Sequence, residues 1–190
     1  GAISGSGALS KSGSGVMTLS GFNTFAGGVN LSGGALQVAN NSALGSGTIA
    51  FTGGRLSSDS SSFRTITNPL AFAGTVTIGD LISNGGLTLT GSGALAANTI
   101  MNVMSRATMS GVLSGSYDFV KTGASELTLG AVNTFTGLTS VNAGTLTLSG
   151  GNALPDASAI TVSAAGILKL ANSESVGGLD GSGTVNLQNN

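Results

Sequence analysis

Apolar residues alternate with small polar residues along most of the chain, in runs of three to five positions that end at Gly, Asn or Ser. This period of two is typical of β-strands that have one buried face and one solvated face. Helical spacing of apolar residues occurs nowhere over a useful length, and each Gly would cost a helix about 1 kcal/mol relative to Ala. The pattern therefore predicts an all-β protein, with its clearest strands at residues 16–20, 35–38, 48–51, 75–78, 87–90, 126–129, 145–148, 159–162, 166–170 and 184–187.

The predicted strands are too short and too numerous for a sandwich of ordinary proportions. Their separations, often 10–20 residues, favour a coil in which each turn supplies two or three short strands and the next turn places equivalent strands on top. Neighbouring turns would lie about 4.8 Å apart. With roughly 20 residues a turn, the chain would form about nine turns and a rod of about 40 Å. We expect Leu19 to stack on Leu36 and Leu129 on Leu146.

Residues 1–44 are repeated without a gap as residues 111–154, and sixteen of the 44 aligned positions are identical. Self-similarity at this scale is typical of stacked-repeat proteins. A degenerate third copy occupies residues 65–91, and residues 92–110 are the least regular part, where we expect a loop or a bulge. We therefore expect one continuous β-helix segment over residues 1–190, cut from a longer chain, with degenerate linking rungs at residues 55–110. The identical pairs include Lys11 and Lys121, Asn23 and Asn133, and Phe25 and Phe135.

Pairs of glycines lie between the predicted strands, where a coil has its corners. Corners require positive φ angles or a close approach of two backbones, and Gly permits both. Asn23 and Asn133 precede Thr-Phe at matching places, which predicts a turn in which Asn adopts the left-handed conformation and bonds its neighbours. Phe25 and Phe135 fit a corner of the coil better than a surface platform for sugars, because aromatic rings contribute large burial energies.

Charged residues make up only 7% of the chain, and 33 of its 190 residues are Gly. Ser, Thr, Asn and Gly must therefore supply the water-facing positions, which suits a sheet better than exposed helices. A hydrophobic content of 40% and a mean hydropathy of +0.38 argue against disorder. The net charge of −1 gives no electrostatic reason to expect a nucleic acid partner. No run of 18 apolar residues occurs, so we expect no membrane span within this segment.

Cys, His and Trp are absent, which removes disulfides, the common zinc sites and imidazole chemistry. Glycoside hydrolysis needs two carboxylates that face one bond, and no two acidic residues lie close enough in sequence to share a strand. We therefore predict no enzyme, no catalytic or metal-binding residue and no cofactor. The acidic residues are Asp59, Asp80, Asp118, Glu126, Asp156, Glu174 and Asp180.

The best-matched charged pair is Lys11 and Lys121, which form either a repeated ligand contact or two turn lysines that keep the coil soluble. We favour turn lysines, and we interpret Glu126, Lys169 and the arginines likewise as solvated positions. Thr-x-Thr phrases at residues 65–67, 75–77, 88–90 and 145–147 suggest a flat threonine array that binds ice. Their spacing along the chain is too uneven to predict one aligned face.

The second copy, KTGASELTLGAVNTFTGLTSVNAGTLTLSGGNAL, and its echo KSGSGVMTLSGFNTFAGGVNLSGGALQVANNSAL closely resemble the passenger-associated transport repeat of bacterial autotransporters. The resemblance implies a right-handed parallel β-helix that is exported across the outer membrane by a type V pathway and displayed on the cell or released. The second copy departs from the family pattern at Pro155, where the first copy has Gly45. Because Pro lacks an N–H donor, we expect Pro155 in a turn or at a strand edge.

The leading hypothesis is a structural stalk and adhesion segment of a surface-exposed autotransporter passenger. It would lie outside the cell, anchored in the outer membrane through a region not present here, and contact a host-surface or matrix ligand. The alternative is the repeating subunit of an extracellular filament, in which open β-helix ends self-associate head to tail. A glycan-active β-helix enzyme is a third hypothesis that the scarce acids and bases disfavour.

Overall fold

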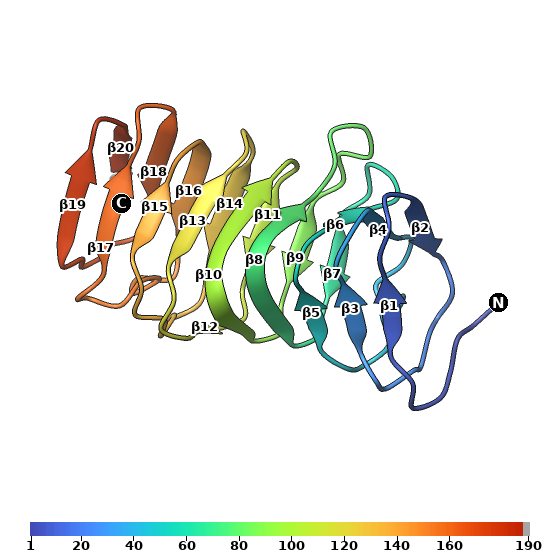
Figure 1. Ribbon diagram of the computed structural model, residues 1–190. Helices are drawn as coiled ribbons and strands as arrows, with labels where there is room; N and C mark the ends of the chain where they lie inside the picture. The colour runs from blue at the N-terminus through green and yellow to red at the C-terminus, as the bar shows by residue number, and fades with distance from the viewer. Residues whose placement is uncertain (188–190) are drawn as a thin grey trace.

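The computed structural model describes residues 1–187, and their regular structure consists of β-strands without any helix (Figure 1). The strands are short because each turn of the coil ends them at a corner. In chain order they are β1 (Leu9–Lys11), β2 (Val16–Leu19), β3 (Val29–Leu31), β4 (Ala35–Val38), β5 (Ile49–Phe51), β6 (Arg55–Ser58), β7 (Arg64–Ile66), β8 (Leu70–Ile78), β9 (Leu87–Leu89), β10 (Gly93–Val103), β11 (Ala107–Met109), β12 (Leu113–Ser114), β13 (Phe119–Thr122), β14 (Glu126–Leu129), β15 (Thr139–Val141), β16 (Gly144–Leu148), β17 (Ala159–Val162), β18 (Gly166–Leu170), β19 (Gly178–Gly181) and β20 (Thr184–Leu187).

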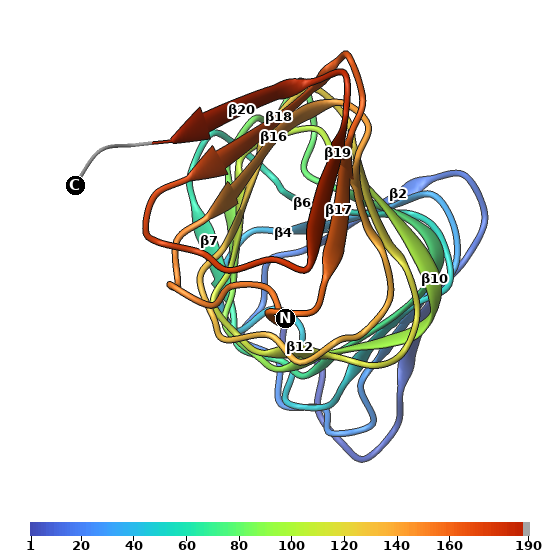
Figure 2. The same cartoon turned by 90° about the vertical axis from the view of Figure 1, so that its left-hand side faces the viewer.

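Two parallel sheets run along the coil, and each strand pairs with its equivalent in the turns before and after. The longest path through the first sheet is β1-β3-β5-β8-β10-β13-β15-β17-β19, which marks nine turns. The second sheet is β20-β18-β16-β14-β11-β9-β7. Figure 2 looks along the coil and shows the turns superimposed around one core. The predicted parallel β-helix of about nine turns is confirmed, and all ten predicted strands lie on strands of the structure.

The core is a set of apolar columns that follow the axis of the coil. Leu129 pairs with Leu148, while Leu127 pairs with Leu146. The expected stacking of Leu129 on Leu146 is therefore wrong by two residues. Leu36 likewise pairs with Met17 rather than with Leu19. One turn of the coil contains more residues than separate Leu19 from Leu36 or Leu129 from Leu146. The alternation of apolar and polar residues therefore identified which side chains point inward, but it did not identify their partners in the next turn.

Aromatic rings fill the corners and the centre of the coil. Phe25 and Phe135 are buried, which confirms their predicted place at corners. Phe135 also contacts Phe119, with ring centroids 6.0 Å apart. Phe51 and Phe72 pair in register on β5 and β8, and their rings stack at 5.0 Å with planes 17° apart.

The linking region holds the main irregularities. The register between β8 and β10 shifts between Leu95 and Thr99, which confirms a bulge within residues 92–110. No loop protrudes there, however, because β10 is a continuous strand of 11 residues. Loops leave the coil at 59–63 and 79–86 instead (Figure 1), where Gly85 N–H donates to the Ser60 carbonyl. Pro155 lies in a turn as predicted, and its carbonyl accepts a hydrogen bond from Ser158 N–H.

The two sequence copies occupy different sides of the coil. Phe119 is the counterpart of Leu9 in the second copy, but it does not lie in the column of paired residues that starts at Leu9. That column ends at Leu113, six residues before Phe119, and Phe119 pairs with Thr99. Accordingly β2 belongs to the first sheet, whereas its counterpart β14 belongs to the second. Features shared by both copies therefore project from different faces, and they do not form one continuous surface. The residues that pair in succession from turn to turn, starting at Leu9, are Leu9, Val29, Ile49, Leu70, Gly93 and Leu113.

Candidate functional site

Lys11 and Lys121 are buried, so the prediction that they are solvated turn lysines is wrong. The Nζ of Lys121 donates to the carbonyls of Thr122, Gly123 and Ala143 at 3.1, 2.7 and 2.9 Å. Two of these carbonyls belong to the corner that follows the lysine, and the third belongs to the next turn. Each lysine thus ties its own corner to the following turn. The Lys11 Nζ makes the equivalent bonds to Ser12, Gly13 and Gly33.

Burial lowers the pKa of Lys121 from its ordinary value of 10.5 to about 8. Between these values the unfolded chain holds a proton that the folded chain has released, so the free energy of unfolding should rise with pH from 8 to 10.5. The added stability is lost again as the pH falls from 10.5 to about 8, because Lys121 then takes up its proton in the folded chain as well. The rise is at most about 3 kcal/mol, because the carbonyl acceptors favour the charged ammonium. Urea unfolding across this pH range should show the slope in the wild type and not in Lys121→Met; equal slopes would contradict the assignment.

Asn23 and Asn133 bridge successive turns through their buried side chains. The Asn133 Oδ1 accepts from Leu113 N–H at 2.7 Å, and its Nδ2 donates to the Ala153 carbonyl at 2.6 Å. The predicted bonding to chain neighbours is wrong, because the side-chain partners of both residues lie 20 residues away in adjacent turns. The predicted left-handed conformation is wrong, since Asn152 is the one non-Gly residue with positive φ within residues 1–187. The sequence showed that this amide recurs but not that its partners lie in adjacent turns.

Close packing of the corners explains the recurrent Gly after each lysine corner. Gly34 has a φ of +63°, and a Cβ there would meet the carbonyl oxygens of Gly13 and Gly15. Gly144, its counterpart, has a φ of +64° and would meet the carbonyl of Gly123. These positions confirm the predicted use of Gly at corners for both positive φ and close approach.

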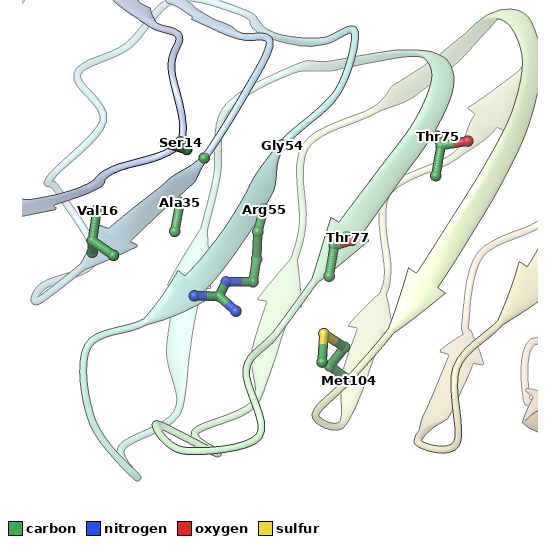
Figure 3. Close-up of a pocket in the computed structure, with 9 residues that line it drawn as sticks. Ser14, Val16, Ala35, Gly54, Arg55, Thr75, Thr77 and Met104 are labelled. Atoms are coloured by element: carbon green, nitrogen blue, oxygen red, sulfur yellow. The ribbon is translucent and has the colours of Figure 1, made fainter.

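A groove of about 430 Å³ crosses the outer side of the first sheet (Figure 3). Val16, Ala35, Arg55 and Thr77 are direct neighbours across β2, β4, β6 and β8, so their side chains form one row across the groove. The floor is hollow at the second turn, because Ala35 and the adjacent glycines have small or no side chains. The remaining lining residues are Ser14, Gly34, Gly54, Thr75 and Met104.

Arg55 is the one charged residue that lines this groove. Its Nη2 pairs with the Asp80 Oδ2 at 2.7 Å, and the Asp80 side chain is only 6% exposed. The other Asp80 oxygen accepts from Ile82 N–H at 2.7 Å, which fixes the carboxylate. The Arg55 side chain is 29% exposed, and its Nε has no hydrogen-bond partner among the described residues. The interpretation of Arg55 as a freely solvated residue is therefore wrong.

Other charged residues also have structural partners. Burial raises the pKa of Asp59, but the hydrogen bond and charge of Arg64 outweigh it and hold that pKa below its usual value. Glu126 accepts from the Thr147 hydroxyl at 2.6 Å. Glu174 accepts from three consecutive backbone N–H groups, those of 152–154, and so orders the loop before Pro155. These contacts correct the prediction of solvated positions for Arg64 and Glu126.

Five threonines do form one aligned column on the outer side of the second sheet. The spacing argument against an aligned face is therefore wrong for the phrases at 65–67, 88–90 and 145–147, because turns of unequal length bring them into register. The phrase at 75–77 lies on β8 in the first sheet. The column consists of Thr65, Thr88, Thr108, Thr128 and Thr147.

Within residues 1–187, no three acidic, His or Cys side chains gather in a group that could hold a metal ion. The same residues include no helix with the length and apolar character needed to cross a membrane.

Comparisons with known proteins agree with the repeats. The model of the passenger-associated-transport-repeat matches residues 9–38 and 119–148, the regions that carry Lys11 and Lys121. The chain is 34% identical over 151 residues to the adhesin BmaC autotransporter of Brucella suis biovar 1 (strain 1330). The match covers 78% of this chain but only 4% of that protein's length. No solved structure matches the chain.

Proposed function

We propose that this chain, in which two segments match the passenger-associated transport repeat, is a stalk and adhesion segment within the passenger of a bacterial surface autotransporter. The two matched repeats and the similarity to a protein named as an autotransporter adhesin support a place at the cell surface or in secreted material. The proposed role within the passenger is mechanical: the segment extends the molecule and presents its side faces to a partner.

The unbroken stack of parallel turns is the observation that carries the stalk role. Each turn pairs only with the turns before and after, so the segment can lengthen without a new core. Lys121 and Asn133 add bonds from side chain to backbone between successive turns. A chain that emerges progressively outside the cell can fold turn by turn on the preceding one, without disulfides.

We propose that residues 1–187 act as one continuous unit without catalytic activity. The first sheet runs from β1 to β19 without a break in strand order, and the second runs from β7 to β20. The acids at the groove and the protruding loops are engaged by Arg55 and Arg64, so they are not free to act as a general acid or base.

Surface display tests the proposal. An antibody raised against the purified segment should label intact cells that produce the parent protein. Deletion of the segment from the parent should reduce adherence to host cells or matrix while an epitope elsewhere in the passenger stays exposed. Labelling that requires permeabilised cells, or unchanged adherence after the deletion, would refute the surface role or the adhesive role respectively.

The head-to-tail filament stays a second hypothesis. Leu179 on β19 is 49% exposed and Leu187 on β20 is 70% exposed, so this end of the stack presents apolar side chains beside unpaired strand edges. A second copy could cover them and extend the fibre. A following turn of the same chain would cover the same residues, which is why the stalk is the preferred function.

A further inference from the structure

The groove on the outer side of β2, β4, β6 and β8 has the dimensions of a ligand site. Its volume of about 430 Å³ lies within the range of small-molecule sites. It spans four successive turns, which is about 14 Å along the coil axis. A groove of this shape suits a short length of an extended chain better than a single compact molecule.

One cation, Arg55, lines the groove, and a second cation, Lys11, lies behind its floor. The buried ammonium of Lys11 lies directly behind Gly34, since a Cβ on that Gly would come within 2.5 Å of the Lys11 Nζ. Lys11 bonds only to carbonyls and has no carboxylate partner among the described residues. Two cations, Lys11 and Arg55, therefore face one anion, Asp80, whose carboxylate is already fixed. This imbalance favours an anionic ligand.

Arg55 is oriented to receive such a ligand. Asp80 binds the Nη2 of its guanidinium and the Nε N–H is buried, while the side chain as a whole stays 29% exposed. The exposed part of a guanidinium held in this way can donate charge-assisted hydrogen bonds to a carboxylate or sulfate. Around it stand the hydroxyls of Ser14, Thr75 and Thr77, beside apolar surface from Val16 and Met104. Hydroxyl partners together with apolar surface match the mixed character of a sugar ring.

We propose that this groove binds a short stretch of an acidic polysaccharide that lies along the coil axis, with a carboxylate or sulfate of the sugar against Arg55. The inference deepens the adhesive role proposed above and rests on it. It assigns recognition to the first sequence copy and its neighbouring turns rather than to the repeat as such.

The second copy provides an internal comparison. Val16 and Ala35 of the first copy correspond to Glu126 and Thr145 of the second. In the following turn, Arg55 pairs with Ala35 and Ile167 pairs with Thr145. There the arginine is missing, an acidic residue takes the place of Val16, and a threonine side chain takes the place of the Ala35 methyl. The same backbone thus carries a row whose acidic residue is paired with Arg106 at 3.6 Å and whose hollow is filled, so it offers no cation of its own to an acidic sugar.

Titration calorimetry with the purified chain tests the proposal. The probes are a tetramer of galacturonic acid, a chondroitin sulfate tetrasaccharide and neutral cellotetraose. At least one acidic probe should bind, more weakly at high salt, and cellotetraose should bind at least tenfold more weakly. Preference between the acidic probes distinguishes a uronic acid polymer from a sulfated glycan, and either preference supports the groove.

Arg55→Gln should lower the affinity for the acidic probe about tenfold or more, because it removes the cation that donates charge-assisted hydrogen bonds to the probe. Ala35→Thr keeps Arg55 and fills the hollow with the residue of the second copy, and it should weaken binding by a similar factor. Arg106→Gln is the matched control, since Arg106 is 66% exposed and lies directly before β11 of the second sheet. Circular dichroism should report the same fold in all three variants.

The proposal fails if neither acidic probe binds, if cellotetraose binds equally well, or if Arg106→Gln weakens binding as much as Arg55→Gln. Failure of the polysaccharide proposal can be distinguished from failure of the surface-display proposal. If the antibody labels intact cells but the purified chain binds neither acidic probe, the proposed ligand is wrong and the proposed stalk role is unaffected.

Discussion

Replacing Phe72 with alanine is expected to lower the free energy of unfolding by about 3–5 kcal/mol. Phe72 is fully buried at the middle of the stack, where its ring stacks on Phe51 at 5.0 Å. It also lies in register between Phe51 on β5 and Leu95 on β10. Loss of the ring removes its transfer energy and leaves a cavity that parallel turns on both sides cannot close, because ladder hydrogen bonds fix their spacing.

Urea unfolding followed by far-ultraviolet circular dichroism measures this loss, since the chain has no Trp to report by fluorescence. Phe22→Ala is the control, because Phe22 is 74% exposed and its replacement should change the free energy by less than about 0.5 kcal/mol. A decrease below about 1 kcal/mol for Phe72→Ala would show that the stack can repack around the gap.

Asn133→Ala is expected to cost about 2–5 kcal/mol. The variant leaves the Leu113 N–H and the Ala153 carbonyl without their partners, and both residues are fully buried. Each unmade buried hydrogen bond costs about 1–3 kcal/mol, because neither group can turn to water. The same amide joins the turn before it to the turn after it, so its loss should also weaken the coupling between these turns.

Asn23→Ala is the matched control for this second substitution. Asn23 makes the same two bonds, at 2.8 Å to Ile3 N–H and 2.6 Å to the Ala43 carbonyl. Ile3, however, is 42% exposed, so its N–H can bond water after the substitution. Urea unfolding should therefore show about half the loss seen for Asn133→Ala. Equal losses in the two variants would mean that burial of the partner does not set the cost.

Alternation of apolar and polar residues located the strands because it is a local property of the backbone. Runs such as 126–129 and 159–162 place successive side chains on opposite faces whatever lies beside them. Other strands were missed, among them β1 and β3 with three residues and β10 with 11, so the length of a strand did not decide whether alternation revealed it. The shared phrase around Asn133 likewise marked a corner, because Phe135 follows at the same place in both copies.

The sequence led to a wrong prediction of solvent exposure for Lys11 and Lys121, because charged side chains are normally exposed. A signal was present: one lysine recurs at the same place, before a Gly, in a chain with very few charges. Its acceptors include Gly33 and Ala143, about a turn away, and they converge on the ammonium only when the coil is formed. For Arg55 the sequence carried no signal, because no counterpart exists in the second copy.

By itself the sequence determined the fold class, the inward or outward direction of most side chains, and the recurrence of one architectural unit. It did so because β-alternation and corner residues act over a few positions. Only the tertiary structure decided which residues are neighbours across turns, through the number of residues that each turn contains. A difference of two or three residues in that number moves Leu36 from Leu19 to Met17, and it places Val16, Ala35, Arg55 and Thr77 in one row.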